Sequence, residues 1–159
     1  MIEKSLNMLE LALEMVKKNK DFYELAIEKC SCRVGDKLYR ILKDDQVRQL
    51  ERINLIYDSL KSDGKWTDKW TAIKVREGGL KIFFKDLISK YEGDSQLNTC
   101  DGSSLEIMID LETRSIGYFK NSLKLAEHAQ EKVFLESMIS ETESHREVLQ
   151  EFKKYLEGL

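Results

Sequence analysis

Glu112 and His145 supply the carboxylate and the imidazole of this sequence that are best placed for chemistry inside a folded chain. Each interrupts a run of apolar residues spaced by three and four, so each is expected to point inward. A carboxylate with an imidazole suits zinc, iron or manganese, and the same two groups can instead form a buried ion pair. Four more polar residues interrupt the apolar runs in the same way: Lys20, Gln46, Gln49 and Thr142.

Four amphipathic segments must position these six residues. Their apolar residues alternate in steps of three and four over residues 6–27, 42–60, 105–126 and 135–156. This spacing is typical of helices that pack at shallow angles in a bundle. The chain has no proline to interrupt them, and Gly35-Asp36 is the predicted start of the second helix. We therefore predict an all-α fold, an antiparallel four-helix bundle.

The stretch from Ser62 to Ser95, between the second and third segments, differs from the segments around it. Its apolar residues predict one short helix: Leu80, Ile82, Phe83, Phe84, Leu87 and Ile88. We expect two helical hairpins joined by a crossover of about 40 residues, which carries the chain along the bundle. Because one hairpin cannot bury its own apolar face, we predict a single domain, residues 1–159.

The two hairpins repeat each other without a gap. Tyr23 matches Phe119, 96 residues further on, and the same offset pairs residues of both helices. These pairs are Val16 with Glu112, Leu38 with Phe134, Leu42 with Met138, Gln49 with His145, Ile53 with Leu149 and Leu60 with Leu156. Duplication of one helical hairpin is the simplest explanation.

The six inward polar residues lie near the middle of their helices, so they are expected to meet in one central polar layer. Burying them without partners would cost about 1–3 kcal/mol each. Our hypothesis is that the Lys20 ammonium, or a protonated His145, pairs with Glu112. The alternatives are that the Lys20 amine reaches water along the helix surface and that His145 is a hydrogen-bonded core histidine.

This pattern resembles the ferritin-like superfamily, and specifically its rubrerythrin-type domains. The residues that carry the resemblance are Phe22-Tyr23, Tyr118-Phe119, Glu112 seven residues before Phe119, and His145 in the fourth helix. In such proteins the first and third helices each give one glutamate, and the second and fourth each give Glu-x-x-His, to hold two irons. The resemblance thus implies a ferritin-like bundle with a diiron site.

Two of the six implied ligands are present in this chain. The third helix keeps Glu112 and the fourth keeps His145. The other four positions fall on Val16, Gln46, Gln49 and Thr142. We expect Glu14 and Asp45 to lie off the inward face, where they cannot replace the lost ligands.

The loss of carboxylates argues against a diiron centre. Two divalent irons would leave about three positive charges uncompensated in a core with one carboxylate, and buried charges of that kind are costly. We therefore predict no cofactor. The alternative is a partial site for iron, manganese or zinc, in which Glu141 joins Glu112 and His145.

The composition limits which partners and which location we expect. The formal net charge is −3 and no basic stripe occurs, so we expect no nucleic-acid partner. No apolar run reaches the length of a membrane span, so we expect no membrane association. Without an export signal the expected location is the cytoplasm, with free thiols at Cys30, Cys32 and Cys100. The sequence assigns no role to these cysteines.

These observations favour a non-catalytic binding or structural protein of the ferritin-like type, acting through its surface as a homodimer or with another protein. One alternative is a metal-dependent oxidoreductase for rubrerythrin-like peroxide or iron handling, with an altered metal site. We expect no rubredoxin-like iron domain of the kind that full rubrerythrins carry, because these residues contain no Cys-x-x-Cys pair. Another alternative is a small-ligand binder that uses the space beside Val16 and Thr142.

Overall fold

The computed structural model describes residues 2–76, 79–94, 96 and 102–159. These residues form five α-helices and one 3-10 helix, and no strand occurs among them. The helices are α1 (Ile2–Lys29), α2 (Arg33–Asp63), the 3-10 helix η1 (Lys69–Ala72), α3 (Leu80–Lys90), α4 (Gly102–Leu125) and α5 (Ala129–Glu157). The prediction of an all-helical fold, packed as a helical bundle, is confirmed.

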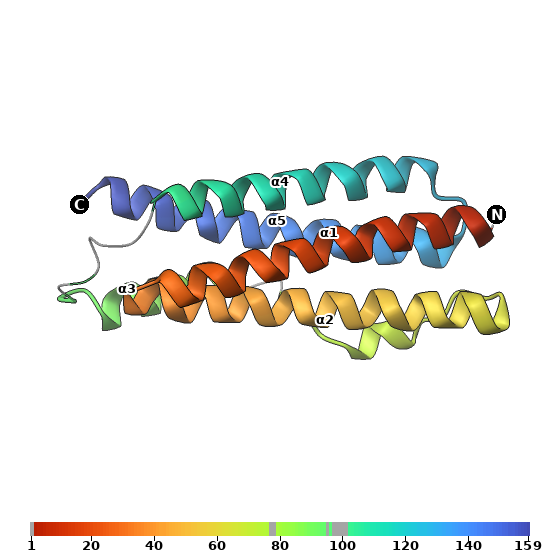
Figure 1. The fold of residues 1–159 in the computed structure, drawn as a ribbon, viewed down its shortest axis with the longest axis horizontal. Coiled ribbons are helices and arrows are strands. Elements are labelled where there is room, and N and C mark those ends of the chain that lie inside the picture. Colours follow the sequence, from red (N-terminus) through yellow and green to blue (C-terminus); the bar gives the residue numbers. More distant parts are fainter. Residues whose placement is uncertain (1, 77–78, 95, 97–101) are drawn as a thin grey trace.

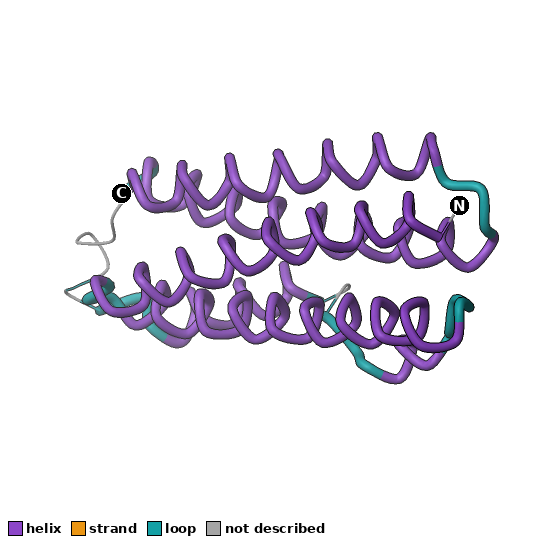
Figure 2. The backbone as a smooth tube through the Cα atoms, turned by 45° about the vertical axis from the view of Figure 1, so that its right-hand side comes forward, coloured by secondary structure: helices purple, strands orange, loops and turns teal. Residues whose placement is uncertain are grey.

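The four long helices lie side by side along one axis (Figure 1). At 28 residues, α1 is about 42 Å long, and the other three are of similar length. The chain reverses direction after α1 and again after α4, so α1 and α5 start at one end of the bundle while α2 and α4 start at the other (Figure 1). The view in Figure 2 shows the same lengthwise packing.

The segment between α2 and α4 connects opposite ends of the bundle and runs along it (Figure 1). It contains η1, which packs on α2, and α3, which packs on α5 and α2. The short helix predicted from Leu80 to Ile88 is therefore confirmed as α3. Trp70 of η1 fastens the connection, because its ring is buried and packs edge-on against Phe134, with 5.5 Å between ring centroids.

The second helix begins earlier than predicted. Its first residue is Arg33, and Cys32 is the N-cap, with Cys32 Sγ accepting a hydrogen bond from the Gly35 amide. Gly35-Asp36 therefore lies inside the first turn and does not start the helix. The helix ends at Gly64, whose left-handed backbone (φ 66°) lets its amide donate to the Leu60 carbonyl oxygen.

Two apolar clusters fill the bundle, one toward each end. The cluster on the α3 side includes Leu38, Leu42, Phe84, Leu105, Met108, Leu149 and Phe152. The cluster on the η1 side includes Leu9, Val16, Ile53, Trp70, Phe119, Phe134 and Met138. Each long helix passes from one cluster to the other through a few buried polar residues: along α2, Leu42 is followed by Asp45, Gln46 and Gln49, and then by Ile53. A polar layer thus separates two apolar cores.

None of the helices in the described ranges is both long enough and apolar enough to cross a membrane.

Candidate functional site

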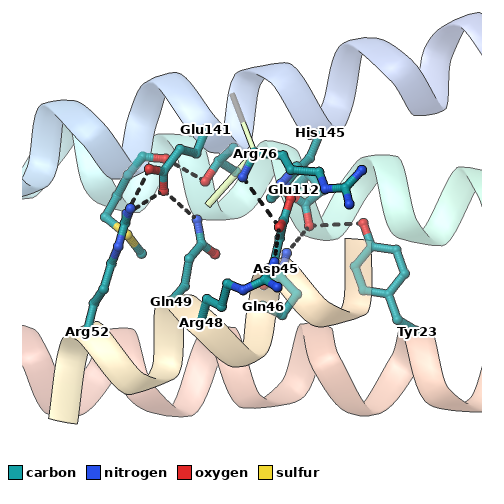
Figure 3. Close-up of polar contacts among 12 residues, drawn as sticks. Tyr23, Asp45, Gln46, Arg48, Gln49, Arg52, Arg76, Glu112, Glu141 and His145 are labelled. Carbon is teal, nitrogen blue, oxygen red and sulfur yellow. Dashed lines mark hydrogen bonds and ion pairs between the residues drawn. The ribbon is translucent and has the colours of Figure 1, made fainter. Parts of the chain in front are cut away.

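His145 of α5 lies at the centre of the polar layer and is fully buried. Its Nε2 lies 3.0 Å from Asp45 Oδ2 on α2, and its Nδ1 lies 3.5 Å from Glu112 Oε2 on α4 (Figure 3). Burial lowers the pKa of His145, but the two carboxylates outweigh this effect and raise the pKa from 6.5 to about 10. At neutral pH the ring is therefore an imidazolium held between two carboxylates.

Glu112 is also held by two uncharged donors. The Tyr23 hydroxyl of α1 and Gln46 Nε2 of α2 each donate to Glu112 Oε1, both at 3.1 Å. Burial, reinforced by the nearby Glu112 charge, raises the pKa of Tyr23 well above its usual value, so the phenol keeps its proton. Glu112, which is fully buried, is thus hydrogen-bonded to α1 and α2 and lies within ion-pair distance of His145 on α5.

Asp45 connects this centre to the segment that follows η1. Its side chain is fully buried, and its Oδ1 accepts from Arg48 Nη1 and from the Arg76 amide, both at 3.4 Å. Arg48 is 44% exposed, so it brings a cation in from the surface of α2. Arg48 therefore links Asp45 to the surface of α2, and Asp45 itself stays buried.

A second buried ion pair lies nearby. Arg52 Nη1 of α2 donates to both carboxylate oxygens of Glu141 on α5, at 2.7 and 2.8 Å, and both side chains are 4% exposed. Gln49 Nε2 adds a bond of 3.3 Å to Glu141, and Arg52 Nε donates to the Ile73 carbonyl oxygen at 2.7 Å. Burial raises the pKa of Glu141, and Arg52 partly offsets that rise. The Arg52 guanidinium also lies over the Trp70 ring, 5.3 Å from its centroid.

The contacts in this layer follow the sequence repeat. Asp45 is equivalent to Glu141, and His145 is equivalent to Gln49, each 96 residues apart. The bond between Asp45 and His145 is therefore equivalent to the bond between Glu141 and Gln49. Where α1 meets α4, Asn19 Nδ2 donates to Ser115 Oγ at 2.9 Å, and these two residues are also 96 apart. The two hairpins thus meet through equivalent positions, as expected for an approximate twofold repeat.

Four of the six predicted residues form part of the polar network. Gln46, Glu112 and His145 meet directly, and Gln49 bonds to Glu141. Thr142 is buried in the layer, but its hydroxyl donates to the Met138 carbonyl oxygen of its own helix.

Lys20 does not join the layer, so its predicted place there is corrected. Its Nζ lies 3.3 Å from Glu24 and 3.5 Å from Asp21, on the surface of α1. Asn19 takes the buried position, because an uncharged amide is much cheaper to bury than an ammonium. Of the two proposed partners for Glu112, the structure brings His145 to it and leaves Lys20 outside.

Asp45 was expected to lie off the inward face, and this expectation is wrong. Asp45 is fully buried because α2 is covered by α5 on one side and by the residues after η1 on another. The same covering buries Arg52, which sequence reasoning missed together with Asn19 and Ser115. The repeat held a usable signal, since an acid occurs at equivalent positions in both hairpins, at Asp45 and Glu141.

The donors of this layer do not fit a pair of irons. Three carboxylates, those of Asp45, Glu112 and Glu141, are matched by three cations, those of His145, Arg48 and Arg52. Metal ions would add charge to a layer that is already close to neutral.

The predicted partial site is not assembled either, because Glu141 is held by Arg52 instead of facing Glu112 and His145. Within the ranges that the structure describes, no three or more His, Cys, Asp or Glu side chains are grouped so as to hold a metal ion.

The cysteines differ from expectation. Cys30 is a free thiol, Cys32 is disulfide-bonded, and Cys100 lies outside the described residues. The prediction of a free thiol is therefore wrong for Cys32.

Comparison of the chain with models of known protein families, with curated proteins and with solved structures found no match. The resemblance to ferritin-like proteins therefore depends on the residues of this chain alone and stays a prediction.

Proposed function

We propose that this chain is an antiparallel, ferritin-like four-helix protein whose buried cations take the place of the metal that rubrerythrin-type proteins hold, and that it works as a non-catalytic binding or structural protein. The observation that carries the proposal is the position of His145, an imidazolium between the carboxylates of Asp45 and Glu112. The positive charge of the ring neutralises these two carboxylates, as a bound metal ion would.

The ferritin-like part of the proposal is supported by the path of the chain. In Figure 1, α2 and α4 start at the same end of the bundle, so the connection between them must return along its length. Two hairpins with such a crossover are a feature of ferritin-like folds. The equivalent contacts of Asp45 with His145 and of Glu141 with Gln49 add the internal repeat.

We infer a non-catalytic role from two features of the polar layer, the burial of its ionisable side chains and their pairing with opposite charges. The side chains of Asp45, Glu112 and His145 are fully buried, so a substrate has no direct path to them. Each of these groups is also engaged with an opposite charge, which leaves none of them as a free acid, base or ligand. A role exerted through the surface is the function that remains.

A second copy of the chain is the partner we propose. Leu11 of α1 and Ile107 of α4 occupy equivalent positions of the repeat and are 55% and 46% exposed. Because α1 packs against α4 and the two helices run in opposite directions, these exposed side chains lie on neighbouring helices toward opposite ends of the bundle (Figure 1). A twofold dimer that packs along both helices would bury these residues on each subunit.

Elemental analysis of aerobically purified protein tests the main proposal. We expect iron, manganese and zinc far below one atom per chain, and full folding after dialysis against a chelator. Iron or manganese near one atom per chain, lost in Glu112→Ala but retained in the surface variant Lys20→Ala, would instead establish the alternative, a metal-dependent oxidoreductase with an altered site.

Sedimentation equilibrium tests the partner. We expect a dimer that Leu11→Glu dissociates, while Ile82→Glu does not, because Ile82 is exposed on α3, which packs on α5 and α2. A monomer at all concentrations would contradict the dimer and leave the ionic layer untouched.

A further inference from the structure

The turn between α1 and α2 brings two sulfur atoms into contact. Residues 30–32 are the non-helical residues between Lys29 and Arg33, and Cys30 Sγ lies 3.8 Å from Cys32 Sγ. Cys30 is a free thiol and is partly exposed, whereas Cys32 is buried and disulfide-bonded. A free thiol thus lies against one sulfur of a disulfide, which is the arrangement from which thiol–disulfide exchange begins.

The first turn of α2 holds Cys32 Sγ in this place. Cys32 is the N-cap, and its Sγ accepts a hydrogen bond from the Gly35 amide at 3.3 Å. Cys30 Sγ is held on the same side, because the thiol donates to the Cys32 carbonyl oxygen at 3.3 Å. Both sulfurs are therefore positioned by the backbone of the turn and of the helix that follows it.

Gly35 makes room for the two sulfurs. A Cβ atom at this position would lie 2.7 Å from Cys30 Sγ, closer than such atoms approach each other, and 3.0 Å from Cys32 Sγ, which is tighter than most such contacts. Any larger residue would push at least one sulfur away. The glycine is therefore a second feature of the chain, independent of the cysteines, that permits the contact between them.

We propose that Cys30 and Cys32 form a thiol–disulfide exchange site, in which Cys30 resolves the disulfide that Cys32 makes with another cysteine. The Cys30 thiolate attacks Cys32 Sγ, and a Cys30–Cys32 bond forms as the bond from Cys32 to its present partner breaks. The partner sulfur leaves as a thiolate and takes a proton from water. One disulfide replaces another, so the step needs no oxidant or reductant.

The step is slow at neutral pH, because Cys30 must first lose its proton. Burial raises the pKa of Cys30, and the nearby Asp36 carboxylate adds to the rise. The rate of exchange should therefore increase with pH above neutrality.

Disulfide mapping of the complete chain tests the step. Protein purified without reductant is moved to about pH 9, where the thiolate is more populated, then quenched in acid, alkylated and digested for mass spectrometry. We expect a Cys30–Cys32 crosslink to accumulate as the first disulfide of Cys32 is lost, at a rate that dilution does not change. In Cys30→Ser, which keeps the size of the side chain, the first disulfide should persist.

A second experiment tests exchange between Cys30 and Cys32 directly and does not require the existing disulfide of Cys32 to break. The variant Cys100→Ser is treated with one equivalent of 5,5′-dithiobis(2-nitrobenzoate). If the two sulfurs exchange, both thionitrobenzoate groups are released and the protein loses two hydrogens in mass. Cys30→Ser and Cys32→Ser, each added to Cys100→Ser, should not form the crosslink. A folded Cys100→Ser protein that keeps one thionitrobenzoate on either cysteine beside an unreacted thiol would overturn the proposal.

Discussion

Gln49 and His145 occupy equivalent positions of two helical hairpins, and each bonds to the acid that the facing helix places in front of it. His145 lies 3.0 Å from Asp45, and Gln49 lies 3.3 Å from Glu141. The two acids are equivalent as well, but only one of their partners is a cation. The other acid receives its cation from Arg52, which lies three residues after Gln49. The chain therefore keeps this one equivalent pair of acids, Asp45 and Glu141, and neutralises each of them with a different cation.

The charge of His145 can be removed with little change of shape by His145→Gln, which places in one hairpin the residue that the other hairpin already has. The free energy of unfolding should fall by about 3–5 kcal/mol at pH 7, because Asp45 and Glu112 lose their shared cation in a buried site. Urea denaturation measures the change. Lys20→Gln is the matched control and should stay within about 0.5 kcal/mol of the parent, because Lys20 is paired only on the surface. Equal losses in the two variants would contradict the central role of His145.

Stability should depend on pH through the same ring. The pKa of His145 is about 10 in the folded chain and 6.5 as the reference for the unfolded chain, so the folded state binds more protons between these values. The contribution is complete below about pH 6.5 and is lost as the pH rises toward 10, by up to about 1.4 kcal/mol per pH unit. The measurement is urea denaturation at several pH values, with the curve of His145→Gln subtracted. A difference that stays constant across this window would show that the ring does not titrate there.

Much of this layer could be predicted from the helical spacing, and the rest could not, for a physical reason. Gln46, Glu112 and His145 follow the apolar residues of their helices, so the spacing places them inward. Asp45 and Arg52 lie to the side of that line on α2. They are buried by the chain after η1, whose Arg76 amide and Ile73 carbonyl oxygen bond to them. The path of a long connection is not encoded in helical periodicity.

Lys20 shows a different limit of the spacing. From Val16, a step of three reaches Asn19 and a step of four reaches Lys20, and both steps occur in helices that pack in bundles. The structure buries Asn19, where it bonds to Ser115 across the repeat. The cost of burying an ammonium decides between the two positions, and periodicity alone does not contain that cost.

Replacing Arg52 alone should lower the stability of the fold, and replacing Glu141 as well should restore part of it. Arg52→Leu leaves the Glu141 carboxylate buried without its cation, and the free energy of unfolding should fall by about 3–5 kcal/mol. Adding Glu141→Leu removes the stranded charge and should restore more than half of the loss, since an apolar pair can replace a buried ion pair. Urea denaturation of both variants measures the effect. A double variant less stable than Arg52→Leu would show that Glu141 is stabilised by other groups.

Tyr23 offers a test in which the chain provides its own reference. Phe119 stands at the equivalent position of the second hairpin, buried and without a hydroxyl, so Tyr23→Phe copies a residue that the fold already accepts. The substitution removes the hydroxyl that donates to Glu112 at 3.1 Å and leaves Gln46 and His145 as the partners of that carboxylate. The free energy of unfolding should fall by about 1–2 kcal/mol, less than for His145→Gln, because a neutral donor is lost and the cation remains. If urea denaturation gives Tyr23→Phe the larger loss of the two, the phenol and not the imidazolium is the main support of Glu112.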